Sequence, residues 1–186
     1  TDTVFRRFIR NLGGCGLIMT EFVSSEGLLR QNLKSKRYLD YTEEERPITA
    51  QIFGADPGHL AEAARQIEDL GFDLIDLNLG CPAKKVVKCG GSGLLRDLPL
   101  LEKILRQIRT AVSIPFTVKI RIGWDDNEIV ALPVAMATAA LGPRIPRAAA
   151  SQRSCARSLP WDRRYRRTSE MATTGKKTTP DNVAAM

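Results

Sequence analysis

The sequence predicts an α/β fold built on a parallel β-sheet. Four short apolar stretches with strand character alternate with stretches whose apolar residues recur at helical spacing. Helix caps and glycine stops separate them. Strands that alternate with helices imply right-handed crossovers, so the strands are expected to run parallel. Two architectures satisfy this pattern, a (β/α)8 barrel and an open doubly wound sheet.

The first part of the chain is predicted to form two helices and two strands. Residues 2–14 show helical spacing of apolar side chains and end in two glycines. Residues 16–24 are predicted as the first strand, and residues 24–32 as a short helix opened by a Ser and Glu capping pattern. Residues 46–56 are predicted as the second strand.

Two more helix and strand pairs follow. An amphipathic helix is predicted over 56–72, with a capping Asp, a Pro in its first turn and a Gly near its end. The third strand is predicted over 72–80, a further helix over 97–112 and the fourth strand over 114–123. Consecutive predicted strands are therefore joined by a predicted helix.

Composition limits the class of protein. The chain has 186 residues, of which 43% are apolar, as is ordinary for a soluble globular domain. It shows no apolar run long enough for a membrane span and no signal peptide. The four cysteines form no CxxC pair, so we predict no metal site and a reduced, cytoplasmic setting. The single histidine, His59, is expected to be a surface residue.

The positive charge is concentrated at the C-terminal end. Residues 131–186 hold ten of the 28 Lys and Arg residues and three of the 21 Asp and Glu residues. The whole net charge of +7 is therefore in this segment, and residues 1–130 are balanced. We divide the chain into a domain over 1–130 and a basic tail of low periodicity over 131–186.

Polar residues stand at the carboxyl end of each predicted strand. In parallel α/β folds these ends meet at one edge, where binding and catalysis gather. One such residue alone is as well explained by a satisfied polar group in the core. Four strands with the same feature favour a shared pocket. The residues are Thr20 and Glu21, Gln51, Asn78 and Cys81, and Lys119 and Arg121.

The most distinctive motif is DLNLGCPAKKVVKCGGSG, residues 76–93. Cys81 stands between Gly80 and Pro82, where the strand must stop and the chain must turn. This position suggests chemistry, although a small hydrophobic residue at a strand end is the alternative. Cys89 lies in a glycine-rich turn, where we favour a structural interpretation.

Three stretches together resemble the tRNA-dihydrouridine synthases, flavin enzymes built on a (β/α)8 TIM barrel with a helical domain after it. They are ITAQIFGAD, DLNLGCPAKKVVKCGGSGLL and PFTVKIRIGWDD, and the resemblance covers about residues 1–130. Dihydroorotate-type dehydrogenases share an Asn-x-x-Cys-Pro stretch, but the basic run after it is not expected there. The resemblance implies about the first half of the barrel, with roughly four of its eight strands.

The resemblance also implies a reaction and its residues. FMN is the implied cofactor, NADPH its reductant and a tRNA uridine the substrate, which receives a hydride at C6 and a proton at C5. Cys81 matches the family's general acid. Gln51 matches the glutamine that binds the flavin's pyrimidine edge, and Lys119 the lysine near N1 and the C2 oxygen. Asn78 matches a position that faces the substrate uracil.

The remaining candidates are expected to contact tRNA. Lys84, Lys85 and Lys88 follow the Cys-Pro motif and are interpreted as phosphate contacts, with a plain solvated loop as the alternative. Arg121 is a further substrate-binding candidate, for which a salt-bridged or solvated state is an equal alternative, as it is for Glu21. The target base must be splayed out of the folded tRNA before it can react.

Several features of the family are missing. The strand that precedes residue 1 in the family, ending in Ala-Pro-Met, is absent, and no Val-His-Gly-Arg strand follows residue 130. The tail is expected to be disordered or to bind nucleic acid, or to result from a reading-frame shift near residue 131. Three functions stay open: a tRNA-uridine reductase, a related flavin enzyme acting on a free pyrimidine, and a non-catalytic RNA-binding remnant. We expect this chain alone to be inactive.

Overall fold

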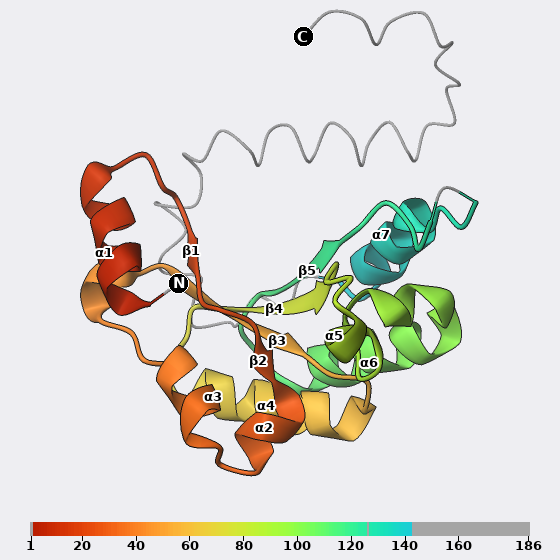
Figure 1. The fold of residues 1–186 in the computed structure, drawn as a ribbon, viewed down its shortest axis with the longest axis horizontal. Helices are drawn as coiled ribbons and strands as arrows, with labels where there is room; N and C mark the ends of the chain where they lie inside the picture. Colours follow the sequence, from red (N-terminus) through yellow and green to blue (C-terminus); the bar gives the residue numbers. More distant parts are fainter. Residues whose placement is uncertain (1, 126, 143–186) are drawn as a thin grey trace, which may run out of the picture. The chain divides into compact units, whose positions relative to one another are not determined.

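The computed structural model describes residues 2–125 and 127–142, and these residues form a parallel sheet with helices (Figure 1). The strand order is β1-β3-β4-β5, and β2 also pairs with β3. Every pairing between the named strands is parallel, which confirms the predicted fold class of half a (β/α) barrel. The strands are β1 (Ile18–Met19), β2 (Val23–Ser24), β3 (Ile48–Phe53), β4 (Leu74–Leu79) and β5 (Phe116–Ile120).

The first predicted strand is interrupted. Met19 pairs with Thr49 and Val23 pairs with Ile52, so five residues (19–23) lie opposite only four residues of β3 (49–52). The extra residue is accommodated as in a β-bulge. There the hydroxyl of Thr20 accepts a hydrogen bond from the backbone N–H of Gln51 at 3.2 Å. The single strand expected over 16–24 is therefore two short strands on the same edge of β3.

Most helices begin with a side chain that accepts a backbone N–H. Asp2, Ser24, Asn32, Asp56 and Asp97 cap α1, α2, α3, α4 and α6 in this way, which satisfies donors left free in the first turn. The helices are α1 (Thr3–Leu12), α2 (Ser25–Leu29), α3 (Leu33–Tyr38), α4 (Pro57–Asp69), α5 (Lys84–Val87), α6 (Leu98–Ala111) and α7 (Ala131–Ala140), with 3-10 turns η1 (Glu43–Glu45) and η2 (Gly91–Arg96).

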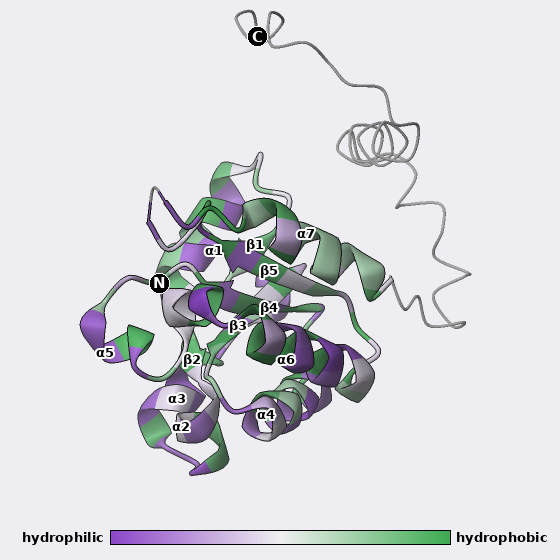
Figure 2. Cartoon of the chain, turned by 90° about the vertical axis from the view of Figure 1, so that its right-hand side faces the viewer, coloured by the Kyte–Doolittle hydropathy of each residue, from purple (hydrophilic) through white to green (hydrophobic). Residues whose placement is uncertain are grey.

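The core lies between one face of the sheet and the two long helices α4 and α6. Both helices carry a hydrophobic and a hydrophilic face (Figure 2). Most of their apolar residues are buried, as are alternate residues of β3 and β4. The buried residues are Leu60, Ala63, Ala64 and Ile67 of α4, Leu101, Ile104, Leu105 and Ile108 of α6, and Ile48, Ala50, Ile52, Ile75, Leu77 and Leu79 of the strands.

Helix α7 corrects the expected boundary at residue 130. The segment from residue 131 was expected to lack regular structure, but Ala131–Ala140 is helical and buries Val134 against the core. The helix is apolar almost all round, and its composition is rich in alanine (Figure 2). Such a helix has high intrinsic propensity but no amphipathic period to detect. Residues 143–186 of the predicted tail lie outside the described residues.

Candidate functional site

Polar side chains cross the sheet on the face opposite α4 and α6. Gln51 of β3 donates through Nε2 to Oδ2 of Asp76 in β4 at 2.7 Å. Asn78, two residues further along β4, donates through Nδ2 to Oε1 of Gln51 at 3.0 Å. Thr117 of β5 donates to Oδ1 of Asp76 at 2.6 Å. Three adjacent strands are thus joined by one hydrogen-bonded network, and its members from β3 and β4 are buried.

Asp76 lies at the centre of this network. Its side chain is only 3% exposed. Burial raises the pKa of Asp76, because a carboxylate loses its hydration there, while the hydrogen bonds from Thr117 and Gln51 and the charge of Lys119 act in the opposite direction. Sequence reasoning missed this residue. The sequence did contain a signal for it, a carboxylate within an apolar strand. Asp76 stands two residues before Asn78, and residues two apart in a strand lie on the same face of the sheet.

Asn78 connects the network to the turn that holds Cys81. Its Oδ1 accepts the backbone N–H groups of Gly80 at 3.0 Å and of Cys81 at 3.1 Å. The same amide donates to Gln51, so the turn and the network share one side chain. The predicted proximity of Gln51, Asn78 and the Cys81 motif is therefore observed.

The turn is also held from its far side. The backbone N–H and the hydroxyl of Ser92 both donate to the carbonyl of Cys81, at 3.2 and 2.9 Å. Gly91, at φ +55°, leaves no room for a side chain, since a Cβ there would lie 3.0 Å from that carbonyl. Gly90, at φ +138°, approaches Gly54, where a Cβ would lie 2.5 Å from the carbonyl oxygen. Cys81 itself is half-buried and its thiol is free.

Lys119 lies in β5, the next strand, and Arg121 is the first residue after it. Lys119 is paired with Asn78 in the parallel register. A Cβ at Gly80 would lie 3.4 Å from Nζ of Lys119 and 3.6 Å from Cγ of Arg121, so both side chains pass close to the turn before Cys81. Both side chains are exposed. The structure thus brings these two cations beside the Asn78–Cys81 turn, as expected from the strand ends.

The three lysines after the motif stand apart from the network. Lys84 and Lys85 lie on the short helix α5, and Lys88 is its C-terminal cap. All three are exposed. They lie three to seven residues after Cys81 in the sequence, and we call these three exposed lysines the basic rim. The thiol of Cys89 donates to the carbonyl of Lys85 at 3.3 Å, which agrees with a structural interpretation of that cysteine.

The other strand-end candidates have local roles. Thr20 donates to the carbonyl of Glu21 at 2.8 Å while it accepts from Gln51, so it supports the network at the bulge. Glu21 is half-buried. His59 is exposed at the start of α4, as predicted. Ser92, Thr117 and Thr20 complete the site without having been singled out as catalytic or binding residues.

The residues present can hold one end of a flavin. Nε2 of Gln51 already donates to Asp76 and to the sulfur of Met19, at 2.7 and 3.1 Å, and Oε1 accepts from Asn78. One lone pair of Oε1 thus remains for a ring N–H. Within residues 2–125 and 127–142, Nζ of Lys119 has no hydrogen bond and is available to an anionic ring edge. This acceptor and this cation fit the pyrimidine end of FMN.

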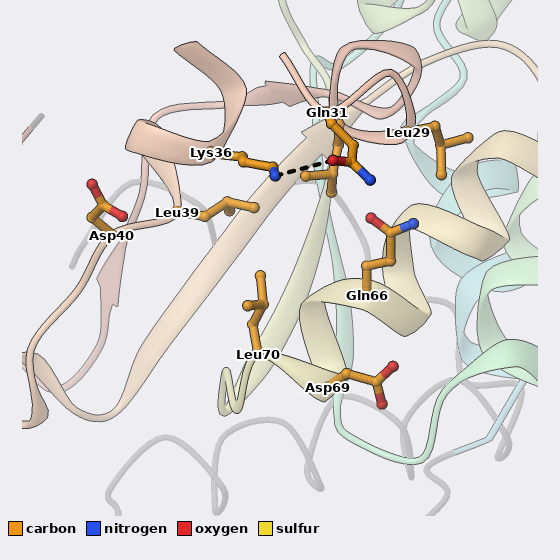
Figure 3. Close-up of a pocket in the computed structure, with 9 residues that line it drawn as sticks. Leu29, Gln31, Lys36, Leu39, Asp40, Gln66, Asp69 and Leu70 are labelled. Carbon is orange, nitrogen blue, oxygen red and sulfur yellow. Dashed lines mark hydrogen bonds between the residues drawn. The ribbon is translucent and has the colours of Figure 1, made fainter. Parts of the chain in front are cut away.

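A cavity away from these residues does not contribute to the site. It has a volume of about 560 Å³ and lies between the α2–α3 segment and α4 (Figure 3). Leu28, Leu39, Gln66 and Leu70 are among its lining residues, and none of the candidate site residues lines it. Lys36 donates to Gln31 at its edge at 3.4 Å. We place the site at the strand ends, because the polar network and the Cys81 turn converge there.

The described part of the chain holds neither a metal-binding cluster nor a membrane-spanning helix. In residues 2–125 and 127–142, no three His, Cys, Asp or Glu side chains are grouped so that they could hold a metal ion. None of the helices in the same residues has the length and apolar character needed to cross a membrane.

The fold and the site define a parallel α/β half-barrel with a cysteine turn at its strand ends. Residues 1–144 match the dihydrouridine synthase (Dus) family, and the chain belongs to this family. It is 47% identical over 129 residues to tRNA-dihydrouridine synthase B of Pseudomonas aeruginosa, covering 68% of this chain and 39% of the relative.

Other relatives give the same result. tRNA-dihydrouridine synthase B of Xanthomonas axonopodis is 45% identical over 126 residues, or 67% of this chain and 38% of the relative. A probable tRNA-dihydrouridine synthase of Rickettsia prowazekii is 43% identical over 130 residues, or 68% of this chain and 39% of the relative. The matched segment thus spans 38–39% of the length of these relatives.

Proposed function

We propose that this chain supplies the first half of the catalytic barrel of an FMN-dependent enzyme that reduces uridine to dihydrouridine in tRNA, with NADPH as reductant. One observation carries the proposal. Lys119 of β5 lies opposite Asn78 of the neighbouring strand β4, and the side chain of Asn78 accepts the backbone N–H of Cys81 in the turn. A cation, a buried amide network and a thiol therefore meet at the strand ends, and the names of the relatives support tRNA as the substrate.

The flavin would be held by Gln51 and Lys119. Gln51 accepts a ring N–H through the remaining lone pair of Oε1, and Asp76 and Asn78 keep its amide from rotating. Lys119 supplies a cation for the negative charge of the reduced ring. When bound, reduced FMN supplies the hydride that adds to C6 of uracil.

Cys81 would supply the proton. Addition of hydride to C6 leaves a negative charge that is neutralised when C5 takes a proton, and a neutral thiol can donate it. The turn that carries this thiol is fixed on both sides by Asn78 and Ser92. The uracil is placed by Asn78 and Arg121, close to Cys81.

The basic rim would bind the RNA backbone. Lys84, Lys85 and Lys88 are exposed next to the turn, where phosphates on both sides of a splayed-out uridine would pass. Lysine–phosphate attraction is screened by salt, so this contribution would weaken as ionic strength rises.

The test is a chimera in which residues 2–142 replace the matched segment of the Pseudomonas aeruginosa relative, assayed for dihydrouridine in tRNA. Cys81→Ala should retain FMN and NADPH oxidation while dihydrouridine formation falls by about 100-fold or more. Lys119→Ala should lose FMN first. Cys89→Ala is the matched control and should behave as the parent chimera. A parent that binds FMN but reduces a free pyrimidine and not tRNA would refute the proposal.

A further inference from the structure

Three pairs of a basic side chain and an aromatic ring lie in the described residues, within the range of cation–π attraction. Measured to the ring centroid, they are Lys34 over Tyr38 at 5.8 Å, Arg46 over Tyr41 at 5.3 Å and Arg96 over Trp124 at 5.1 Å. The first pair belongs to one turn of α3, so helix geometry alone accounts for its contact.

The polar groups of the second pair are used by the fold. Arg46 donates to Glu43 at 2.7 Å, to Asp73 at 2.8 Å and to the hydroxyl of Tyr41 at 2.9 Å. That hydroxyl donates in turn to the carbonyl of Leu70 at 3.1 Å. The second pair is therefore part of the scaffold, because its donors are satisfied within the protein.

The third pair differs, because its donors are free. Within residues 2–125 and 127–142, neither the guanidinium of Arg96 nor the indole N–H of Trp124 makes a hydrogen bond. Nε of Arg96 has only a long ion-pair contact with Glu128 at 3.9 Å. The side chain of Arg96 is 59% exposed and Trp124 is half-buried. A stacked pair with unused donors is suited to a ligand that has both a ring and acceptor oxygens.

The turn that carries Trp124 holds it in a fixed position. The N–H of Trp124 donates to the carbonyl of Glu128 at 3.0 Å, and Gly123 forms an antiparallel bridge with Ile129. Oδ1 of Asp125 accepts the N–H of Glu128 at 3.0 Å. A ring that is ordered in advance loses little conformational entropy when a ligand packs on it.

The Arg96–Trp124 pair is tied to the turn that carries Cys81. Arg96 ends η2, and Ser92 of η2 donates to the carbonyl of Cys81 at 2.9 Å. Four residues of 3-10 helix separate Ser92 from Arg96, or about 8 Å. Trp124 follows Arg121 by three residues, at most about 11 Å of chain, and Arg121 passes close to the same turn. The pair therefore lies beside the turn.

We propose that a nucleobase next to the target uridine stacks on the Arg96–Trp124 pair. Because it takes RNA as the partner, this inference rests on the proposed function. Bases stack on aromatic rings and on guanidinium planes, and their carbonyl and phosphate oxygens accept N–H donors. A carboxylate partner would use the donors alone.

The stack lowers the cost of extracting the uridine. When the uridine leaves the base stack to reach Cys81, its neighbour loses a stacking partner. The Arg96–Trp124 pair replaces that partner beside the turn. Its contribution is therefore to the binding of RNA and not to the transfer of hydride or proton.

The experiment measures the affinity of the chimera described above for labelled tRNA by fluorescence anisotropy. Trp124→Leu should weaken binding by about tenfold, because it removes the ring and keeps an apolar side chain. Trp124→Phe keeps a ring and should stay within about threefold of the parent. Arg96→Gln should also weaken binding, and the double variant should lose less than the product of the single losses, since the two side chains act as one stack.

A change in the RNA should mirror the change in the protein. An abasic nucleotide on one side of the uridine that the chimera reduces should weaken binding to the parent by about tenfold, and should not weaken binding to Trp124→Leu further. The same change on both sides in turn identifies the stacked base.

The pair on α3 supplies the matched controls. Tyr38→Leu and Lys34→Gln remove a ring and a cation of the same kind, and each should leave tRNA affinity within about twofold. Circular dichroism and FMN content should be unchanged in all variants. A chimera that reduces tRNA but binds it equally well after Trp124→Leu, or one weakened equally by Tyr38→Leu, would overturn this inference alone. A parent that does not bind tRNA would overturn the proposed function with it.

Discussion

At the level of single residues, Asp76 has the most unusual environment of the site. Both of its oxygens accept hydrogen bonds, from Gln51 and Thr117, and these bonds favour the ionised form. Burial has the larger effect and raises the pKa of Asp76. The network therefore holds a carboxyl group whose ionised form is disfavoured by burial. An asparagine at this position has the same shape and can keep the geometry of the network.

Asp76→Asn should make stability less dependent on pH. A carboxyl whose pKa is raised in the folded state stabilises it below the unfolded pKa, and that stabilisation is lost as pH rises through the folded pKa. Asparagine has no such titration. The difference in unfolding free energy, wild type minus variant, should therefore decrease as the pH rises from the ordinary Asp pKa of 3.8 to the raised pKa of the folded state. Denaturant titrations over this range measure it, and a difference that rises with pH would contradict the assignment.

Sequence reasoning at this scale located the residues at the strand ends but not those inside the strands. Gln51, Asn78 and Lys119 could be placed together, because parallel strands end at one edge. Asp76 was treated as part of an apolar strand, since a two-residue period does not show which face is polar. The contact of Ser92 with Cys81 joins positions eleven residues apart, and no local pattern predicts it.

At the level of elements, the loop from β4 to α6 determines where Cys81 lies. It folds back through η2, and Gly90 rests against the backbone of Gly54 at the end of β3. Both close contact and a positive φ require glycine at position 90. The position of the Cys81 turn thus depends on how closely this loop packs on a neighbouring strand.

Gly90→Ala should displace the loop and expose the Cys81 thiol. The new methyl group would lie 2.5 Å from the carbonyl oxygen of Gly54, and its φ of +138° would be strained. We expect a loss of about 2 kcal/mol or more in unfolding free energy. Thiol labelling of Cys81 should become faster. Gly16→Ala is the control, because a Cβ there meets nothing within 4 Å, and loop positions equal in both variants would contradict this account.

A second element-scale prediction concerns Glu68 at the end of α4. Its Oε1 accepts from the N–H and hydroxyl of Ser113 and from the N–H of Ile114, which fixes the entry to β5. Burial acts to raise the pKa of Glu68, but the hydrogen bonds from Ser113 and Ile114 and the charge of Arg109 outweigh it, so that the pKa is lowered.

Glu68→Ala should lower the unfolding free energy at neutral pH by about 1 kcal/mol. Because the folded pKa is lowered, this stabilisation is present above the ordinary Glu pKa of 4.5 and is lost as pH falls through the folded value. Denaturation at pH 7 and pH 3 measures both. Glu62→Ala, on the exposed face of α4, should change little, and an effect of Glu68→Ala that persists at pH 3 would contradict the charged contact.

The sequence predicted elements with a clear period and missed those without one. Helices α4 and α6 combine caps with an amphipathic pattern, and both lie where expected. Helix α5 is too short to show a period, and α7 has no polar face. The break between β1 and β2 depends on pairing with β3, which a local pattern does not contain.

At the level of the whole molecule, the chain alone should retain FMN poorly. Gln51 and Lys119 hold one end of the ring, whereas the phosphate sites of such barrels lie in late-strand loops. Within the described residues, the outer edges of β1 and β5 pair with no further strand, and such edges should also favour aggregation. Bound flavin after gel filtration should be far below one per chain. A yellow monomer with one FMN would contradict this prediction.

At this scale, the number of strands could be predicted from the sequence, but the orientation of the helices could not. Four strand patterns indicated half of a barrel, and the pairing of the strands confirms it. The orientation of α1 was not predictable, since its pattern of apolar residues gives a face but not the direction in which that face points. The buried pair of Arg6 and Glu45, 39 residues apart, decides that direction.

The close approach of Gly90 to Gly54 also has a genetic consequence. The obstacle to a side chain at position 90 is the main chain of residue 54, which every amino acid shares. No replacement at position 54 can therefore make room, and a Cβ added at Gly54 would itself clash with the hydroxyl of Ser25. A population that carries a defect at codon 90 should recover by reversion at that codon, and second-site suppressors should not arise at codon 54.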